Sequence, residues 1–302
     1  MAYRAGFLGI IGQPNAGKST LMNYLVKEKV SIVTAKPQTT RRRIMGIWSN
    51  EAGQIVFVDA PGLIEAEKGL NGFLAKEAAD VIQNSDAILA VVSVDEAKAE
   101  DAEKTIEMVS KSGKPWMGII TKTDITEKAH RVLILKNMIE SKGAKALSMS
   151  VKKLKDNAEE REALLIECLE MLPETPAPLY DVELFTNESV KDMTTEIIRE
   201  KCFENLHQEI PFNLAIRIIK FDEFADPCPK IYAEILVPKE NHRAIVIGKG
   251  GEVIKKIGSE SRKEIEKIMD QKVFLDLQVV VRDNWFDNTG IMKELKYVVD
   301  NK

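Results

Sequence analysis

A glycine-rich loop between an apolar strand and a helix most constrains the fold of this chain. An apolar run, Phe7–Ile11, precedes the loop, a helical pattern over Ser19–Val26 follows it, and the loop reads Gly12-Gln13-Pro14-Asn15-Ala16-Gly17-Lys18-Ser19. In this pattern the glycines let backbone N–H groups point at phosphates, the lysine reaches the β- and γ-phosphates, and the serine hydroxyl ligates Mg²⁺. The context therefore predicts a nucleoside triphosphate site and not a chance turn.

The alternation of strands and helices predicts the fold class of residues 1–172. Short apolar runs indicate strands at Phe7–Ile11, Ile55–Val58, Ile88–Val94, Trp116–Ile120 and Ala146–Met149. Helical patterns lie between them, at Ser19–Val26, Leu74–Gln83, Ala99–Ser112, Lys128–Ser141 and Glu160–Leu172. This order is typical of an α/β domain whose mostly parallel sheet has helices on both faces, with ligands at the carboxyl ends of the strands.

A proline-rich stretch separates this domain from a second one. Three prolines within residues 173–178 exclude a continuous helix and predict a semi-rigid linker over residues 173–185. Beyond it, residues 186–302 change to an α+β order. That order is a helix, two strands, a short helix, a glycine-rich turn, a long helix and a last strand, with bounds near Ser189–His207, Asn213–Phe221, Lys230–Val237, Asn241–Ile247, Gly251–Asp270 and Val273–Arg282.

Composition excludes several classes of protein. With 44% hydrophobic residues, 30% charged residues and a net charge of −4, the 302-residue chain resembles an ordinary globular protein rather than one that coats nucleic acid through bulk charge. Cys168, Cys202 and Cys228 lie too far apart for a metal or disulfide motif, which favours reduced thiols in the cytoplasm. The apolar run Ala87–Val94 is too short to span a bilayer. We expect a cytoplasmic protein, at most peripheral on a membrane.

Three further segments follow predicted strands and indicate guanine as the base. In Asp59-Ala60-Pro61-Gly62 the carboxylate is expected to hold Mg²⁺ and the Gly62 N–H to contact the γ-phosphate. In Thr121-Lys122-Thr123-Asp124 the last carboxylate can accept two hydrogen bonds from guanine N1–H and N2–H₂, which adenine does not offer, while the Lys122 stem lies along the base. Ser150-Val151 places a backbone N–H for guanine O6.

Residues 5–172 resemble a translation-factor-related GTPase, and Lys36-Pro37-Gln38-Thr39-Thr40-Arg41 is similar to the first switch of the Era family. The resemblance implies that a switch threonine closes onto Mg²⁺ when GTP is bound. Alignment assigns this role to Thr40, with Thr39 as the alternative. Whether the basic run that starts at Arg41 meets RNA or only water stays open.

The chain departs from the family pattern at two places on the base side. Thr121 replaces the usual asparagine and Val151 the usual alanine. The threonine hydroxyl has less reach than an amide, so we expect a weaker connection between loops. Because Asp124 is kept, we expect guanine selectivity to survive.

Hydrolysis is expected to be slow without a partner. Leu63 stands where Ras-like enzymes carry a glutamine that orients water, and a leucine side chain makes no hydrogen bond. This resembles the hydrophobic-substituted GTPases, in which an asparagine at the position of Asn15 can help to bind K⁺. The alternative is that Asn15 bonds only protein backbone.

The second domain resembles a type II KH domain. The turn Ile247-Gly248-Lys249-Gly250-Gly251 lies between two predicted helices, and a Gly-x-x-Gly turn there lets an RNA backbone approach closely. Residues Lys239 to Lys263 include seven basic and three acidic side chains, a local positive patch in an acidic domain. Trp285 and Phe286 can stack on a base, although core anchors are the favoured interpretation.

Together these resemblances imply a GTP-hydrolysing, Mg²⁺-dependent switch that binds 16S rRNA near its 3′ end and acts in assembly of the 30S subunit, as a monomer with peripheral inner-membrane association. Two other classes remain as alternatives: an ATP-dependent kinase or ATPase, and a GTPase whose second domain docks a protein. The predicted catalytic residues are Lys18, Thr40 and Gly62, and the metal ligands are Ser19, Thr40 and Asp59. The predicted nucleotide contacts are Gly12, Asn15, Ala16, Gly17, Lys18, Ser19, Thr20, Asp59, Gly62, Thr121, Lys122, Asp124, Ser150 and Val151. The predicted RNA contacts are Ile247, Gly248, Lys249, Gly250, Gly251, Lys255 and Lys256.

Overall fold

The computed structural model describes residues 2–34, 36, 39–63, 69–96, 98–152 and 158–297. Contacts between residues divide the chain into two compact units, with the main boundary between Asn187 and Glu188. Each unit is described by itself below. Of the predicted first switch, Pro37 and Gln38 lie outside the described residues.

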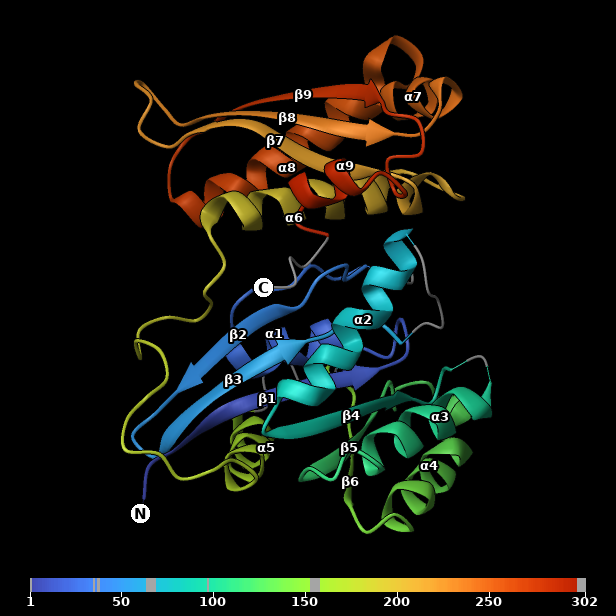
Figure 1. Ribbon diagram of the computed structural model, residues 1–302, viewed down its shortest axis with the longest axis vertical. Coiled ribbons are helices and arrows are strands. Elements are labelled where there is room, and N and C mark those ends of the chain that lie inside the picture. Colours follow the sequence, from blue (N-terminus) through green and yellow to red (C-terminus); the bar gives the residue numbers. More distant parts are fainter. Residues whose placement is uncertain are drawn as a thin grey trace. The chain divides into compact units, whose positions relative to one another are not determined.

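The first unit contains a six-stranded sheet in the order β2-β3-β1-β4-β5-β6 (Figure 1). Its strands are β1 (Arg4–Gly12), β2 (Ile44–Ser49), β3 (Gly53–Asp59), β4 (Ala87–Ser93), β5 (Trp116–Thr121) and β6 (Lys145–Ser148). Neighbours pair in parallel except β2, which runs antiparallel to β3. The five predicted strands are therefore confirmed, and their carboxyl ends share one edge of the sheet.

Strand β2 was not predicted from the sequence. It is a short edge strand that includes a glycine, which hides the alternation of a half-buried strand. The turn that joins it to β3 does carry a signal. The Asn50 side chain accepts hydrogen bonds from the backbone N–H groups of Ala52 and Gly53, at 2.8 and 3.0 Å, as turn asparagines commonly do.

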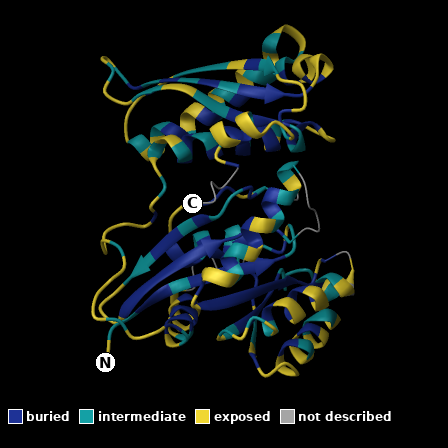
Figure 2. Ribbon diagram, in the orientation of Figure 1, coloured by how far each residue is buried: buried dark blue, intermediate teal, exposed yellow. Residues whose placement is uncertain are grey.

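Helices cover both faces of this sheet. α1 (Lys18–Val26) and α5 (Ala158–Glu170) pack on one face, around a core that includes Leu8, Phe57 and Leu165. α2 (Gly69–Asn84), α3 (Ala99–Ser110) and α4 (His130–Glu140) supply apolar side chains to the other face. The central strands are buried along their whole length, as Figure 2 shows, because parallel strands lie between two helical layers.

The proline-rich segment after α5 is hydrogen-bonded to the first unit. The Ala5 N–H donates to Pro173 O at 3.2 Å, and the Ile47 N–H donates to Phe185 O at 2.8 Å. Between these points the buried side chain of Gln54 accepts from the N–H groups of Leu179 and Tyr180. The segment predicted as a linker is thus held along the edge of the sheet near β2 and β3.

The second unit is a three-stranded sheet backed by helices. Its elements are α6 (Val190–Asn205), β7 (Ala215–Asp222), β8 (Lys230–Val237), α7 (Glu240–Ile247), α8 (Glu252–Met269), β9 (Phe274–Val281) and α9 (Thr289–Glu294). β7 is antiparallel and β9 parallel to the central β8. Apolar side chains of α6 and α8 form one core with this sheet, and the predicted α+β class is confirmed.

Candidate nucleotide site and Gly-x-x-Gly loop

The loop between β1 and α1 has the backbone that its glycines predict. Gly17 adopts φ 97° and Asn15 adopts φ 63°, both in the left-handed region. A Cβ atom on Gly12 would lie 2.2 Å from the carbonyl oxygen of Val91, so only glycine fits where β1 meets β4. The loop can therefore turn its backbone N–H groups inward at the carboxyl edge of the sheet.

Lys18 is the first residue of α1 and is only 6% exposed. Its Nζ donates to the carbonyl oxygens of Gly12 and Gln13, each at 3.0 Å. Burial lowers the pKa of Lys18, and the nearby charges of Asp59 and Glu96 act in the opposite direction. The ammonium group is thus held inside the loop, where a phosphate would gain a desolvated positive charge.

Three hydroxyl groups converge on the buried carboxylate of Asp59, the last residue of β3. Its Oδ2 accepts from Ser19 Oγ at 2.5 Å, Ser31 Oγ at 3.1 Å and Thr40 Oγ1 at 3.4 Å. The Ser19 and Thr40 hydroxyl oxygens are 3.0 Å apart. Burial raises the pKa of Asp59, while Lys18 and the three hydroxyls lower it.

The other oxygen of Asp59, Oδ1, is buried and has no hydrogen-bond partner among the described residues. A buried carboxylate with one unpaired oxygen, clustered with the hydroxyls of Ser19 and Thr40, fits Mg²⁺, which prefers oxygen ligands. The structure brings Thr40, not Thr39, to this place. Thr39 instead donates to Lys36 O at 2.8 Å within its own loop.

Gly62 and Leu63 lie against the phosphate loop. A Cβ atom on Gly62 would lie 2.6 Å from Pro14 Cγ, and the Leu63 N–H donates to Gly12 O at 3.2 Å. The Leu63 side chain packs against the apolar core on the α2–α3 face. It therefore has no role as a hydrogen-bonding group, as the sequence predicts.

On the base side, Ser150 Oγ donates to Asp124 Oδ1 at 2.5 Å, which orients the carboxylate. Lys122 adopts φ 58°, and its Nζ lies 3.6 Å from Asp95 Oδ2. Val151 is half-buried against the core. These residues come from the loops after β5 and β6, so the structure brings the predicted base-binding segments together.

Thr121 makes a direct connection to the phosphate loop. Its Oγ1 donates to Ala16 O at 2.5 Å and lies 3.3 Å from Val92 O, and its side chain is buried. The sequence predicted a weakened connection here because a hydroxyl reaches less far than an amide. The close approach of β5 to the loop removes the need for that reach.

A cleft of about 690 Å³ opens over these elements. Of the predicted residues, its walls include Asn15, Gly17, Lys18, Ser19, Thr20, Thr40, Gly62 and Lys122. The other predicted contacts do not line it: Gly12, Ala16, Asp59, Thr121, Asp124, Ser150 and Val151. Of these, Ala16, Asp59 and Thr121 are buried. Its volume lies within the range typical of small-molecule sites.

Sequence reasoning missed three acids that line the cleft, Asp95, Glu96 and Asp101, of which Glu96 is the most buried. Glu96 is 8% exposed and lines the wall. Its Oε1 accepts from the Ser93 N–H at 3.0 Å, and its Oε2 has no partner in the part of the chain that the structure describes. Burial raises the pKa of Glu96 to about 7. The sequence signal that could have found Glu96 is its position shortly after β4, which ends at Ser93 on the binding edge of the sheet.

In the second unit, the Gly-x-x-Gly loop begins where α7 ends at Ile247. Gly248, Gly250 and Gly251 have φ angles of 73°, 61° and 80°. A Cβ atom on Gly250 would meet no atom within 4 Å, so its backbone is open to an approaching chain. A groove of about 300 Å³ beside the loop is lined by Ile254, Lys255, Gly258, Ser259, Arg262, Leu275 and Leu277.

Burial bears on two open questions from the sequence. Trp285 is fully buried and its Nε1 donates to Asn213 O at 2.8 Å, which confirms the core-anchor interpretation. Arg41 is 2% exposed, so the first residue of the basic run is not part of a solvated face. Arg43 Nε lies 3.7 Å from Glu77 Oε2.

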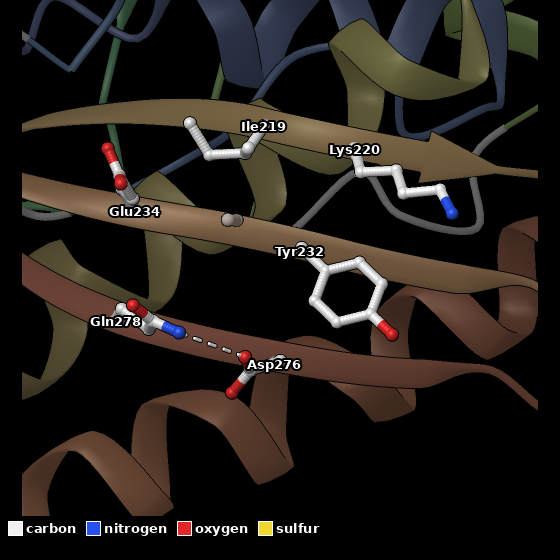
Figure 3. Close-up of a pocket in the computed structure, with 7 residues that line it drawn as sticks. Ile219, Lys220, Tyr232, Glu234, Asp276 and Gln278 are labelled. Carbon is white, nitrogen blue, oxygen red and sulfur yellow. Dashed lines mark hydrogen bonds between the residues drawn. The ribbon is translucent and has the colours of Figure 1, made fainter.

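A second hollow, of about 330 Å³, lies on the outer face of the second sheet (Figure 3). Ile219, Lys220, Tyr232 and Asp276 line it, together with Gln278, whose amide donates to Asp276 Oδ2 at 3.3 Å. Its charged groups are of both signs and no glycine loop borders it. Its chemistry therefore does not match the polyanion site expected beside Gly248.

Comparison with known proteins supports a GTPase domain and a KH domain in one chain. A family model described as "50S ribosome-binding GTPase" matches residues 7–122, and a KH domain model matches residues 229–286. The GTPase Era of Geotalea uraniireducens is 36% identical over 301 residues, which cover 98% of both chains. The chain belongs to the GTPase Era family. The Era of Neisseria meningitidis is also 36% identical, over 295 residues.

Solved Era structures share the whole architecture. An Era variant of Aquifex aeolicus bound to GDP and AlF₄⁻ superimposes with a TM-score of 0.89 at 30% identity, covering 98% of this chain and 100% of that one. An Era complex with MgGDPNP and nucleotides 1506–1542 of 16S ribosomal RNA matches equally well. This member of the Era family is accordingly a P-loop GTPase with a KH domain.

Proposed function

We propose that this protein is a GTP-operated switch that binds 16S rRNA near its 3′ end and acts in assembly of the 30S subunit. The observation that carries the proposal is the presence, in one chain, of the cleft around Lys18 and Asp59 and of the open loop at Gly250. The solved Era complex with 16S RNA supports the small subunit as the target. The matching family model, by contrast, carries the description "50S ribosome-binding GTPase".

The proposed chemistry is in-line hydrolysis of GTP with Mg²⁺ bound by Ser19, Thr40 and Asp59. When bound, the ion would neutralise charge that develops on the phosphate oxygens. Lys18 would exchange its two carbonyl acceptors for phosphate oxygens. The Gly62 N–H would contact the γ-phosphate, since this residue lies against the phosphate loop at Pro14.

The base is proposed to be guanine, recognised by Asp124 with Ser150 and Val151 behind it. The competing ATPase function predicts tighter binding of a fluorescent ATP analogue than of the GTP analogue. We expect the reverse, by at least about tenfold, because adenine does not offer Asp124 the two N–H donors that guanine does. Equal affinities would contradict guanine selectivity.

Turnover is proposed to be slow and to be accelerated by K⁺. Leu63 provides no hydrogen bond to water, and Asn15 lines the cleft in a left-handed conformation. We expect faster hydrolysis in KCl than in NaCl at equal ionic strength, with the difference lost in Asn15→Ala. Equal rates in the two salts for the wild type would rule out a K⁺ site.

RNA is proposed to bind across Ile247–Gly251, with Lys249, Lys255 and Lys256 neutralising phosphates. The test measures the affinity for an RNA of the 16S 3′ sequence by fluorescence anisotropy. The protein is loaded either with GDP or with a non-hydrolysable GTP analogue. We expect Lys249→Asp with Gly250→Asp to abolish binding, whereas Lys142→Asp, an exposed control in the first unit, leaves it unchanged. Unchanged binding by the double variant would favour a protein-docking role instead.

We also propose that the protein works as a monomer in the cytoplasm, with peripheral contact to the inner membrane. Among the described residues, no helix combines the length and apolar character that a bilayer crossing needs. The three cysteines form no disulfide, and Cys168 and Cys202 are buried. Sedimentation of the protein with and without anionic vesicles would test the membrane contact.

A further inference from the structure

One asparagine in α1 fixes the backbone of an irregular segment beside the metal cluster. The Oδ1 atom of Asn23 accepts from the N–H groups of Val30 and Ser31, at 3.0 and 2.9 Å. Its Nδ2 donates to Ser31 O at 2.6 Å. Three hydrogen bonds with one side chain thus replace the pairing that a regular element would supply at Val30 and Ser31.

The side chain of Ser31 points from this fixed backbone to Asp59. Ser31 is 1% exposed, and its hydroxyl donates to Asp59 Oδ2 at 3.1 Å. The residues are 28 positions apart in the sequence, so the contact exists only because the segment after α1 passes the end of β3. A buried hydroxyl that donates to a carboxylate orients it and favours its charged form.

The three hydroxyls around Asp59 Oδ2 are not equivalent. Ser19 and Thr40 belong to the predicted metal ligands, and Thr40 belongs to a switch that is expected to move with the nucleotide. Ser31 is outside that set and is fixed by Asn23 through its backbone. Its hydrogen bond can therefore hold Oδ2 in every nucleotide state and leave Oδ1 for the cation.

We propose that Ser31, held by Asn23, is a positioning residue that orients the Asp59 carboxylate for Mg²⁺. The inference rests on the proposed Mg²⁺-dependent GTP site and adds two residues to it. Groups that orient metal ligands commonly change metal affinity by about 10- to 100-fold when they are removed. Neither Asn23 nor Ser31 lines the cleft itself.

The test is the Mg²⁺ dependence of GDP binding, measured with a fluorescent GDP analogue. For Ser31→Ala we expect the Mg²⁺ concentration at half-effect to rise roughly tenfold, while affinity in EDTA changes less than about twofold. Asn23→Asp, which keeps the acceptor but loses the Nδ2 donor, is expected to give a smaller rise. If the alanine variant does not fold, Ser31→Cys, whose side chain is close to serine in shape, removes the same hydroxyl and is expected to give the same rise in the Mg²⁺ concentration at half-effect.

Ser85→Ala is the matched control. Ser85 is also buried in the first unit, and its hydroxyl donates to Val81 O at 2.7 Å, away from the metal cluster. We expect it to lower thermal stability without changing the Mg²⁺ dependence. If Ser31→Ala behaves like this control, or loses as much affinity in EDTA as in Mg²⁺, the positioning role is wrong. If the wild type itself shows no Mg²⁺ dependence, the proposed GTP site fails instead.

Discussion

The buried carboxyl group of Glu96 makes the stability of the first unit depend on pH. It faces Lys18 from α1, Asp101 from α3 and Arg131 from α4. Burial is the largest effect on its pKa and raises it; Asp101 adds to the rise, and the Ser93 N–H, Arg131 and Lys18 oppose it. The pKa rises from 4.5 to about 7.

The sign follows from which state holds the proton. Because the folded pKa lies above the unfolded value, the folded state binds the proton more tightly between about pH 4.5 and 7, and stability falls as pH rises through this range. At about 1.4 kcal/mol per pKa unit, the gap from 4.5 to about 7 corresponds to roughly 3 kcal/mol. Above about pH 7 the full penalty for an ionised Glu96 is present.

Glu96→Gln removes the ionisation and keeps the shape. We expect this variant to gain stability over the wild type as pH rises, by about 2 kcal/mol between roughly pH 5.5 and 8. The assay is native-state hydrogen exchange of peptides from β1 and β4, which reports the unfolding free energy of the first unit alone. Glu103→Gln, an exposed residue of α3, is the control for loss of a charge.

A stability difference between Glu96→Gln and the wild type that is equal at both pH values would refute the reasoning. It would mean that Glu96 in the folded state does not titrate between about pH 5.5 and 8. A difference that shrinks as pH rises would contradict the sign itself.

Three further substitutions test single contacts. Thr121→Val leaves Ala16 O without its hydroxyl donor, and we expect GDP affinity to fall roughly tenfold, with Thr121→Ser close to wild type in a mant-GDP titration. Trp285→Phe loses the hydrogen bond to Asn213 O, and we expect the stability of the second unit to fall by about 2 kcal/mol. Hydrogen exchange of β7 measures this loss, and RNA affinity should be retained while the unit is folded. In Gly250→Ala there is space for the Cβ atom, but an alanine is strained at a φ of 61°, so we expect stability to fall by about 1 kcal/mol. We expect a larger relative loss of RNA affinity, because the methyl group projects where the RNA backbone would approach.

The sequence by itself determined the parts of the site that depend on local backbone chemistry. Gly12 and Gly17 are required by a loop that curls around phosphates, so their spacing with Lys18 and Ser19 is visible without a structure. Asp59 and Asp124 were predictable for a related reason. Each lies at or just after the end of a buried strand, and the carboxyl ends of parallel strands meet at one edge.

Tertiary structure alone decided the contacts between segments that are distant in the chain. Thr39 and Thr40 are neighbours of the same type, and only the position of β3 shows that Thr40 reaches Asp59. The same is true of Ser31, whose hydroxyl meets Asp59 across 28 positions, and of Glu96, whose burial depends on α3 and α4. A hydrogen bond needs atoms within about 3 Å, and no local pattern specifies which segments the sheet order brings that close.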